Sequence, residues 1–238
     1  MDQEIIKKFF IFFFILITIT VGSSLAWNIR KEYNFVQEMS NNEAKASHER
    51  DVLFRRWASM HGGAYVPITE QTPPNPLMSD IPDRDIVTPS GKKLTLMNPA
   101  YMNRQIYSMA EADGLLGHLT SLNPIRKENK ADVWETNALQ QCQRGNYEIK
   151  SMETVNGQNY LRVMYALNTE KDCISCHSKQ GYKLGDILGG ISIAVPIDKY
   201  RYISNNHIIN VIKIHTIAYF ILLLIIFIKY KIAVNEHE

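Results

Sequence analysis

Residues 147–167 have the sequence YEIKSMETVNGQNYLRVMYAL, and this stretch decides the fold class. The runs at 147–152 and 159–167 are rich in residues that favour strands, and the Asn156-Gly157 pair between them is a preferred two-residue hairpin turn. We therefore predict a β-hairpin. A third strand is predicted at residues 188–196, LGGISIAVP, where an apolar run ends at a proline.

Helices are predicted on both sides of these strands. No Gly or Pro occurs from residue 23 to residue 61, and apolar residues recur at helical spacing, so we expect one long helix that Gly62-Gly63 ends. Shorter helices are expected from Pro99 to about 109–112 and over 130–143, and another from Lys199 onward. Seven prolines between residues 64 and 100 predict an ordered loop. The predicted class is α+β.

Two long apolar blocks lie near the ends of the chain. Residues 9–27 begin FFIFFFILITITV, and residues 208–228 are IINVIKIHTIAYFILLLIIFI. Each block has about the length of a helix that crosses a bilayer, so we predict two transmembrane helices. For the first block a cleaved signal peptide is the alternative, because Ser24-Leu25-Ala26 places small residues at the positions that determine cleavage.

The charges beside these blocks predict an orientation. Lysines flank both outer ends, which favours residues 1–8 and 229–238 in the cytoplasm and residues 28–206 outside, although Arg30 and Lys31 oppose this. The whole chain is nearly neutral, with 26 Lys and Arg against 24 Asp and Glu. We therefore expect no nucleic-acid partner, since such proteins carry a clear basic excess.

The motif that carries chemistry is Cys173-Ile174-Ser175-Cys176-His177, in a segment predicted as a loop between two strands. CxxCH is the spacing for c-type haem: two thiols form thioethers with the vinyl groups, and the histidine supplies the proximal iron ligand. A thioredoxin-like dithiol, a zinc site and a plain disulfide are the alternatives. We predict one covalent haem c, held by Cys173, Cys176 and His177. Cys142 is left over and is expected to be a half-buried thiol.

Haem of this type is attached on the outer side of the bacterial inner membrane. The motif thus supports the orientation that the outer lysines indicate, with the haem domain facing the periplasm or the outside. The lipid bilayer is the first expected partner.

Further strings resemble a known family. They are Arg56-Trp57, His61–Pro67 (HGGAYVP), Pro74-Asn75-Pro76, Arg84-Asp85-Ile86, Gly91–Gln105 (GKKLTLMNPAYMNRQ) and Gly189–Ile193 (GGISI). Together with the CxxCH motif they resemble the Tll0287-like (DUF3365) haem-sensor family over about residues 30–200. The resemblance implies a PAS-like extracytoplasmic domain with covalent haem c. Many relatives continue into a HAMP segment and a kinase, cyclase or chemotaxis-type output.

Ten residues follow the second apolar block, from Lys229 to Glu238. They are too few for an output domain, so we expect a signal to pass to a separate partner, such as a histidine kinase, or electrons to pass to a redox carrier. A homodimer is also considered. Our first hypothesis is a redox or gas sensor module; the alternative is a single-haem electron-transfer cytochrome. We see no catalytic constellation and predict that the chain is not an enzyme.

Two further residues are candidates for the haem site. His61, at the junction of the long helix and the core, is a candidate distal iron ligand, against the alternative of a helix-terminal histidine bonded to the backbone. Arg104 is a candidate partner for a haem propionate, against an ordinary surface ion pair. The other distal candidates are His48, Met60, Met102, His118, Cys142 and Met152.

Overall fold

The computed structural model describes residues 3–235, apart from the side chains of Gln3, Asp172, Ser175, Cys176 and Ser178. It divides into two compact units. The terminal unit comprises residues 1–39 and 197–238, and the central unit comprises residues 40–196.

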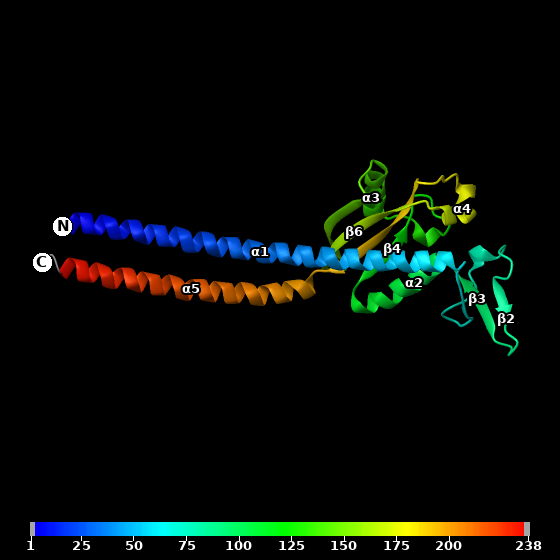
Figure 1. Cartoon of the computed structure of the whole chain (residues 1–238), viewed down its shortest axis with the longest axis horizontal. Helices are drawn as coiled ribbons and strands as arrows, with labels where there is room; N and C mark the ends of the chain where they lie inside the picture. Colours follow the sequence, from blue (N-terminus) through cyan, green and yellow to red (C-terminus); the bar gives the residue numbers. More distant parts are fainter. Residues whose placement is uncertain (1–2, 236–238) are drawn as a thin grey trace. The chain divides into compact units, whose positions relative to one another are not determined.

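The terminal unit is a pair of antiparallel helical segments, from α1 (Gln3–Met60) and α5 (Asp198–Asn235) (Figure 1). Thr18 Oγ1 lies 2.9 Å from the Tyr219 hydroxyl, and Ser24 Oγ lies 3.1 Å from His215 Nε2. In these two contacts, the higher residue number in α1 pairs with the lower one in α5, so the two helices run antiparallel. Both helices are long and apolar enough to cross a membrane.

The predicted ends of these helices are confirmed. α1 stops at Met60, and Gly62 and Gly63 follow with φ of +70° and +106°. Only glycine adopts such backbone angles without strain, so the helix cannot continue. α5 begins directly after Pro196 and Ile197 and runs without interruption.

The centre of the fold is a four-stranded antiparallel sheet. Its strands are β4 (Leu116–Thr120), β5 (Glu148–Val155), β6 (Gln158–Asn168) and β7 (Ile187–Pro196), in the order β4-β7-β6-β5. The hairpin prediction is confirmed: Val155 pairs with Gln158, and Asn156 and Gly157 have φ of 51° and 80°. The α+β class is confirmed, while the PAS-like description stays a prediction.

One face of this sheet is covered by α3 (Val133–Gln143). Ala138, Leu139 and Cys142 of the helix pack with Met164 of β6. The expected half-buried state of Cys142 is wrong, because only 1% of this residue is exposed. Burial raises the pKa of its thiol, so Cys142 is an unreactive core residue.

The opposite face carries the last turns of α1 and the helix α2 (Pro99–Ala110). The His48 ring of α1 stacks on Tyr165 of β6 with centroids 4.2 Å apart. Tyr107 of α2 lies over Gly117 of β4 so closely that any side chain at Gly117 would overlap its ring. α2 begins where the sequence predicts, with Asn98 as N-cap and Pro99 in the first turn.

Residues 64–100 differ from the prediction of a loop. They form a small antiparallel sheet of β1 (Ala64–Pro67), β2 (Asp85–Val87) and β3 (Lys93–Met97), in the order β1-β3-β2, with a single 3-10 turn, η1 (Pro76–Met78). The prolines do not prevent this, because Pro67 ends an edge strand and Pro89 lies in the turn after β2. The other 3-10 turns are η2 (Glu111–Asp113), η3 (Lys127–Asn129) and η4 (Ser178–Gln180).

A buried charge cluster fixes α3 to the sheet. Glu135, which has no exposed surface, lies 2.9 Å from His118 Nδ1 and accepts a 2.8 Å hydrogen bond from Arg162. Arg162 also donates to Asp132, and Asp132 with Glu135 forms a capping box at the start of α3. The cluster therefore joins β4, β6 and α3.

These contacts shift the pKa values of Glu135 and His118 in opposite directions. Burial acts to raise the pKa of Glu135, but hydrogen bonding to His118 and the charges of His118 and Arg162 outweigh it and lower the pKa to about 2. The hydrogen bond to Glu135 raises the pKa of His118 above its ordinary value of 6.5. The pair is thus held as carboxylate and imidazolium, each stabilising the other.

Candidate functional site

The CxxCH motif lies on a short helix, α4 (Lys171–His177), and not in a loop as predicted. Positions 176 and 177 follow position 173 by three and four residues, so each is a neighbour of position 173 on the helix surface. Cys173 is a half-buried free cysteine. The side chain of Cys176 lies outside the described residues.

The segment that carries α4 connects the end of β6 to the start of β7, and hydrogen bonds join its two ends. Thr169 donates from its backbone nitrogen, 2.7 Å, and from its hydroxyl, 3.0 Å, to the carbonyl oxygen of Asp186. The Gly185 nitrogen donates to the Thr169 carbonyl oxygen at 3.0 Å. We call these contacts the neck; they place both ends of the segment at one edge of the sheet.

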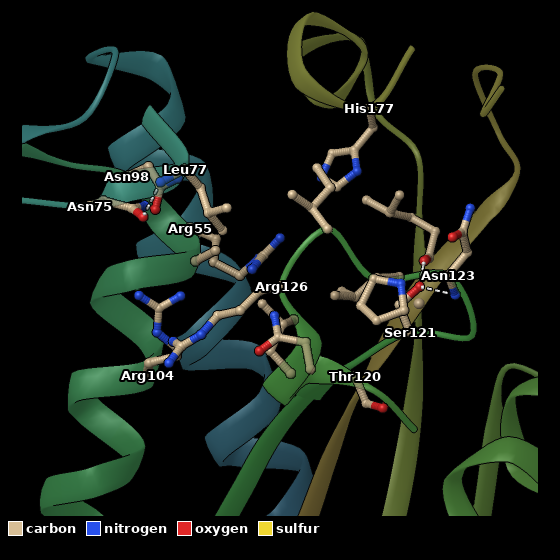
Figure 2. A pocket seen from close by; sticks show the side chains of 18 of the residues that line it. Arg55, Asn75, Leu77, Asn98, Arg104, Thr120, Ser121, Asn123, Arg126 and His177 are labelled. Atoms are coloured by element: carbon tan, nitrogen blue, oxygen red, sulfur yellow. Dashed lines mark hydrogen bonds between the residues drawn. The ribbon is translucent and has the colours of Figure 1, made fainter. Parts of the chain in front are cut away.

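His177 points into a cavity of about 170 Å³ at that edge (Figure 2). β4 and β6 end here and β7 begins, and Leu119, Leu167 and Leu188 from these strands form an apolar wall. The mostly apolar lining, with a few polar groups, is typical of a site for an organic ligand or cofactor.

Arginines line the same cavity: Arg55 from the end of α1, Arg104 from α2 and Arg126 from the connection after β4 (Figure 2). Arg126 donates to Glu128 at 2.8 Å. Arg55 and Arg104 have no carboxylate partner among the described residues, and the buried Nη1 of Arg55 has no hydrogen bond there. The cavity therefore has an excess of positive charge.

The surroundings of the arginines also indicate an excess of positive charge in the cavity. Burial lowers the pKa of Arg104, and the neighbouring Arg126 lowers it further, so the two guanidinium groups repel each other. Burial also lowers the pKa of Arg55, while Tyr107, Cys173 and nearby carboxylates act against that shift. Cys173 thus lies within electrostatic range of a cavity residue. An anion bound between the arginines would relieve the repulsion.

A hydrogen-bonded chain holds the His177 ring in place. His177 Nδ1 lies 2.6 Å from Gln180 Oε1, and Gln180 Nε2 donates to the backbone carbonyl oxygen of Asn123 at 2.7 Å. Asn123 itself donates from its backbone nitrogen to Ser121 Oγ, 3.2 Å, which bonds to the Leu188 carbonyl at the start of β7. This chain of hydrogen bonds uses Nδ1 of His177, and the other ring nitrogen is Nε2.

The structure brings Arg104 and His177 into one cavity, but His61 lies elsewhere. His61 is exposed, its Nδ1 is 2.8 Å from the Trp57 carbonyl oxygen, and its ring packs against Trp57. This is the backbone-bonded alternative considered for it. None of the other distal candidates is among the cavity residues: His48, Met60, Met102, His118, Cys142 and Met152. A distal ligand stays a prediction.

Sequence reasoning did not find Arg55, Arg126 or Gln180. The resemblance drew attention to Arg56, but the neighbouring Arg55 faces the cavity while Arg56 is exposed. A helical-face argument could have separated the two arginines. No local signal marks Arg126 or Gln180, because their roles depend on segments that meet only in the folded chain.

The model of the Tll0287-like family matches residues 34–196, which is more than half of the chain. The chain belongs to the Tll0287-like family. The resemblance expected over about residues 30–200 is thereby confirmed. Every residue that lines the cavity, from Arg55 to Gly189, falls inside the Tll0287-like match.

Solved structures include one match, the crystal structure of the cyanobacterial haem protein Tll0287. The identity is 14% and the TM-score is 0.34, over 41% of this chain and 70% of that one. The comparison with curated proteins found no match. Membership of the Tll0287-like family therefore rests on the family model.

Proposed function

We propose that this chain is a membrane-anchored c-type haem protein whose central unit binds one covalent haem. Cys173 and Cys176 would form the thioethers, and His177 would bind the iron. The observation that carries the proposal is the cavity that a CxxCH histidine shares with two arginines, neither of which has a carboxylate partner among the described residues. Family membership and the haem content of the solved protein Tll0287 support the same cofactor.

The donor set fits haem in three respects. The imidazole of His177 is an iron ligand type, the apolar wall of Leu119, Leu167 and Leu188 suits a porphyrin face, and the arginines suit carboxylates. Haem has two propionates, and Arg55 and Arg104 are the two cavity arginines that lack a carboxylate among the described residues. We assign the propionates to these arginines.

Bound haem would supply one-electron redox chemistry and a coordination site for a small gas. The chain's own residues then have separate tasks. His177 would bind the iron, the leucine wall would exclude water, and the arginines would bind the propionates. Arg55 lies on α1, the helix whose N-terminal part is apolar enough to cross a membrane.

This continuity supports a sensor in preference to a simple electron carrier. We propose that a change of iron oxidation state, or binding of a gas, alters the contact at Arg55 and so biases α1 between two states. The central unit would lie outside a bacterial inner membrane, anchored by α1 and α5. The output would pass to a separate signalling protein such as a histidine kinase.

Absorption spectra of the purified full chain test the cofactor, recorded oxidised and reduced, with and without CO or NO. We expect a c-type spectrum and haem that stays attached after denaturation. Amide hydrogen exchange in α1 around residue 55, compared between oxidised and reduced protein, tests the sensor. Absence of haem would overturn the whole proposal. Unchanged exchange together with fast electron transfer to a soluble carrier would replace the sensor with the electron-transfer alternative.

Replacing Arg55 with Gln is expected to lower the reduction potential without loss of covalent haem. Removing a positive charge beside the haem edge favours the ferric form, and we expect a shift of about tenfold in the ferric-to-ferrous ratio, about 59 mV. Arg104→Gln should act in the same direction. Spectroelectrochemical titration measures the shift.

Arg56→Gln is the matched control, since it removes the same charge one residue away on the exposed side of α1. It is expected to leave the potential unchanged. Equal potentials for the Arg55 and Arg56 variants would refute the propionate assignment.

A further inference from the structure

We infer that Gln180 is a positioning residue that sets the proton position on His177, and through it the reduction potential of the haem. The inference rests on the proposed function, because it concerns the iron ligand named there. Gln180 belongs to η4, directly after α4, and is not part of the CxxCH motif.

The first step fixes the orientation of the Gln180 amide. One end of that amide lies 2.7 Å from the backbone carbonyl oxygen of Asn123. A carbonyl oxygen only accepts hydrogen bonds, so the amide nitrogen must face it. The Asn123 carbonyl is held in turn by the contacts of Asn123 and Ser121 to the start of β7 (Figure 2).

The second step fixes the tautomer of His177. With the amide nitrogen on Asn123, the amide oxygen faces His177 Nδ1 at 2.6 Å. That oxygen only accepts, so Nδ1 must carry the proton. The lone pair of the neutral ring is then on Nε2, and the ring offers that nitrogen to a metal.

Gln180 also affects how strongly the His177 imidazole binds a metal. An acceptor on the second ring nitrogen makes an imidazole more electron-rich and fixes its orientation. A neutral amide oxygen does this less than a carboxylate would. Gln180 therefore gives an intermediate ligand strength, which a change of acceptor should move in either direction.

Opposite shifts are expected from two substitutions. Gln180→Glu places a carboxylate on Nδ1–H, favours the ferric form and should lower the potential. Gln180→Leu removes the acceptor and should raise it. We expect about tenfold in the ferric-to-ferrous ratio for each, about 59 mV in opposite directions. The iron–histidine stretching frequency of the reduced protein should rise in the first variant and fall in the second.

Lys179→Leu is the control, because Lys179 is an exposed residue in the same turn. Loss of its positive charge can only lower the reduction potential, which is opposite to the shift expected from Gln180→Leu. All variants are first tested for haem retained after denaturation. If the wild-type chain holds no haem, the proposed function fails. If haem is retained and the potential and stretching frequency of both Gln180 variants equal those of the wild type, only the present inference fails.

A second measurement does not use the reduction potential. In the Cys173→Ser, Cys176→Ser chain, after any reversibly bound haem has been extracted, nitrogen-15 NMR of His177 should show a proton on Nδ1 and none on Nε2 at a pH where the ring is neutral. Adding Gln180→Leu to that chain should abolish this preference. A proton on Nε2 in the parent chain would overturn the assignment.

Discussion

Replacing Cys173 and Cys176 together with serine is expected to abolish covalent haem attachment. Serine hydroxyls do not add to vinyl groups as thiols do, so no thioether can form. The measurement is the haem retained by the full chain after denaturation and acidic solvent extraction, which should fall from about one per chain to none. His177 and the arginines would remain, so a weakly and reversibly bound haem is the expected residual state.

Cys142→Ser is the matched control for this experiment. Cys142 lies in the α3 core against Met164 and is not among the cavity residues. Its variant should keep full covalent haem, at a cost only to stability. Covalent haem that survives the double substitution would contradict the thioether assignment.

Replacing Glu135 with Ala is expected to destabilise the central unit by about 3–5 kcal/mol. This is the usual cost of removing one partner of a buried ion pair, because His118 would lose its carboxylate partner and Arg162 would keep only its contact with Asp132. Urea unfolding of the full chain in detergent gives the free energy, and hydrogen exchange in β6 and β7 gives its location. Glu148→Ala, which removes an exposed pair with Lys150, should cost under about 1 kcal/mol.

The same cluster predicts a pH profile for the wild-type chain. The pKa of Glu135 is lowered, so its contribution is present above its ordinary value of 4.5 and is lost as pH falls toward about 2. The pKa of His118 is raised, so its contribution is present below 6.5 and is lost as pH rises through its folded value. Both contributions are complete between about pH 4.5 and 6.5. A Glu135→Ala profile as steep as the wild type on both sides of this window would contradict the assignment.

Local signals account for the parts of the fold that were predicted correctly. The hairpin depends on Asn156-Gly157 and its flanking strands, and α2 depends on Asn98 and Pro99, so neighbouring residues were sufficient. The small sheet of β1, β2 and β3 was missed because its strands are short and many prolines lie near them. β4 was missed as well: it is a five-residue strand whose partner β7 lies far along the chain.

The candidate site divides in the same way. His177 was predicted as a site residue because the CxxCH motif consists of adjacent residues, and it lines the cavity. Arg104 was proposed on chemical grounds and does line the cavity with His177. Arg55 and Gln180 act through contacts with distant segments. A helical-face argument could have separated Arg55 from Arg56, but no spacing in the sequence indicates Gln180. His61 illustrates the converse, since a histidine beside a glycine pair is equally well explained by its bond to the Trp57 carbonyl.

The neck at Thr169 and Asp186 has a consequence for how such a protein can change over time. Its hydrogen bonds, from Thr169 to Asp186 and from Gly185 to Thr169, hold together the two ends of residues 170–184. Insertions, deletions or a new ligand type within this segment need not disturb the pairing of β6 with β7. The segment with the CxxCH motif is therefore an exchangeable module. Grafting it between relatives at these two residues is a direct route to proteins with altered cofactor chemistry on an unchanged sheet.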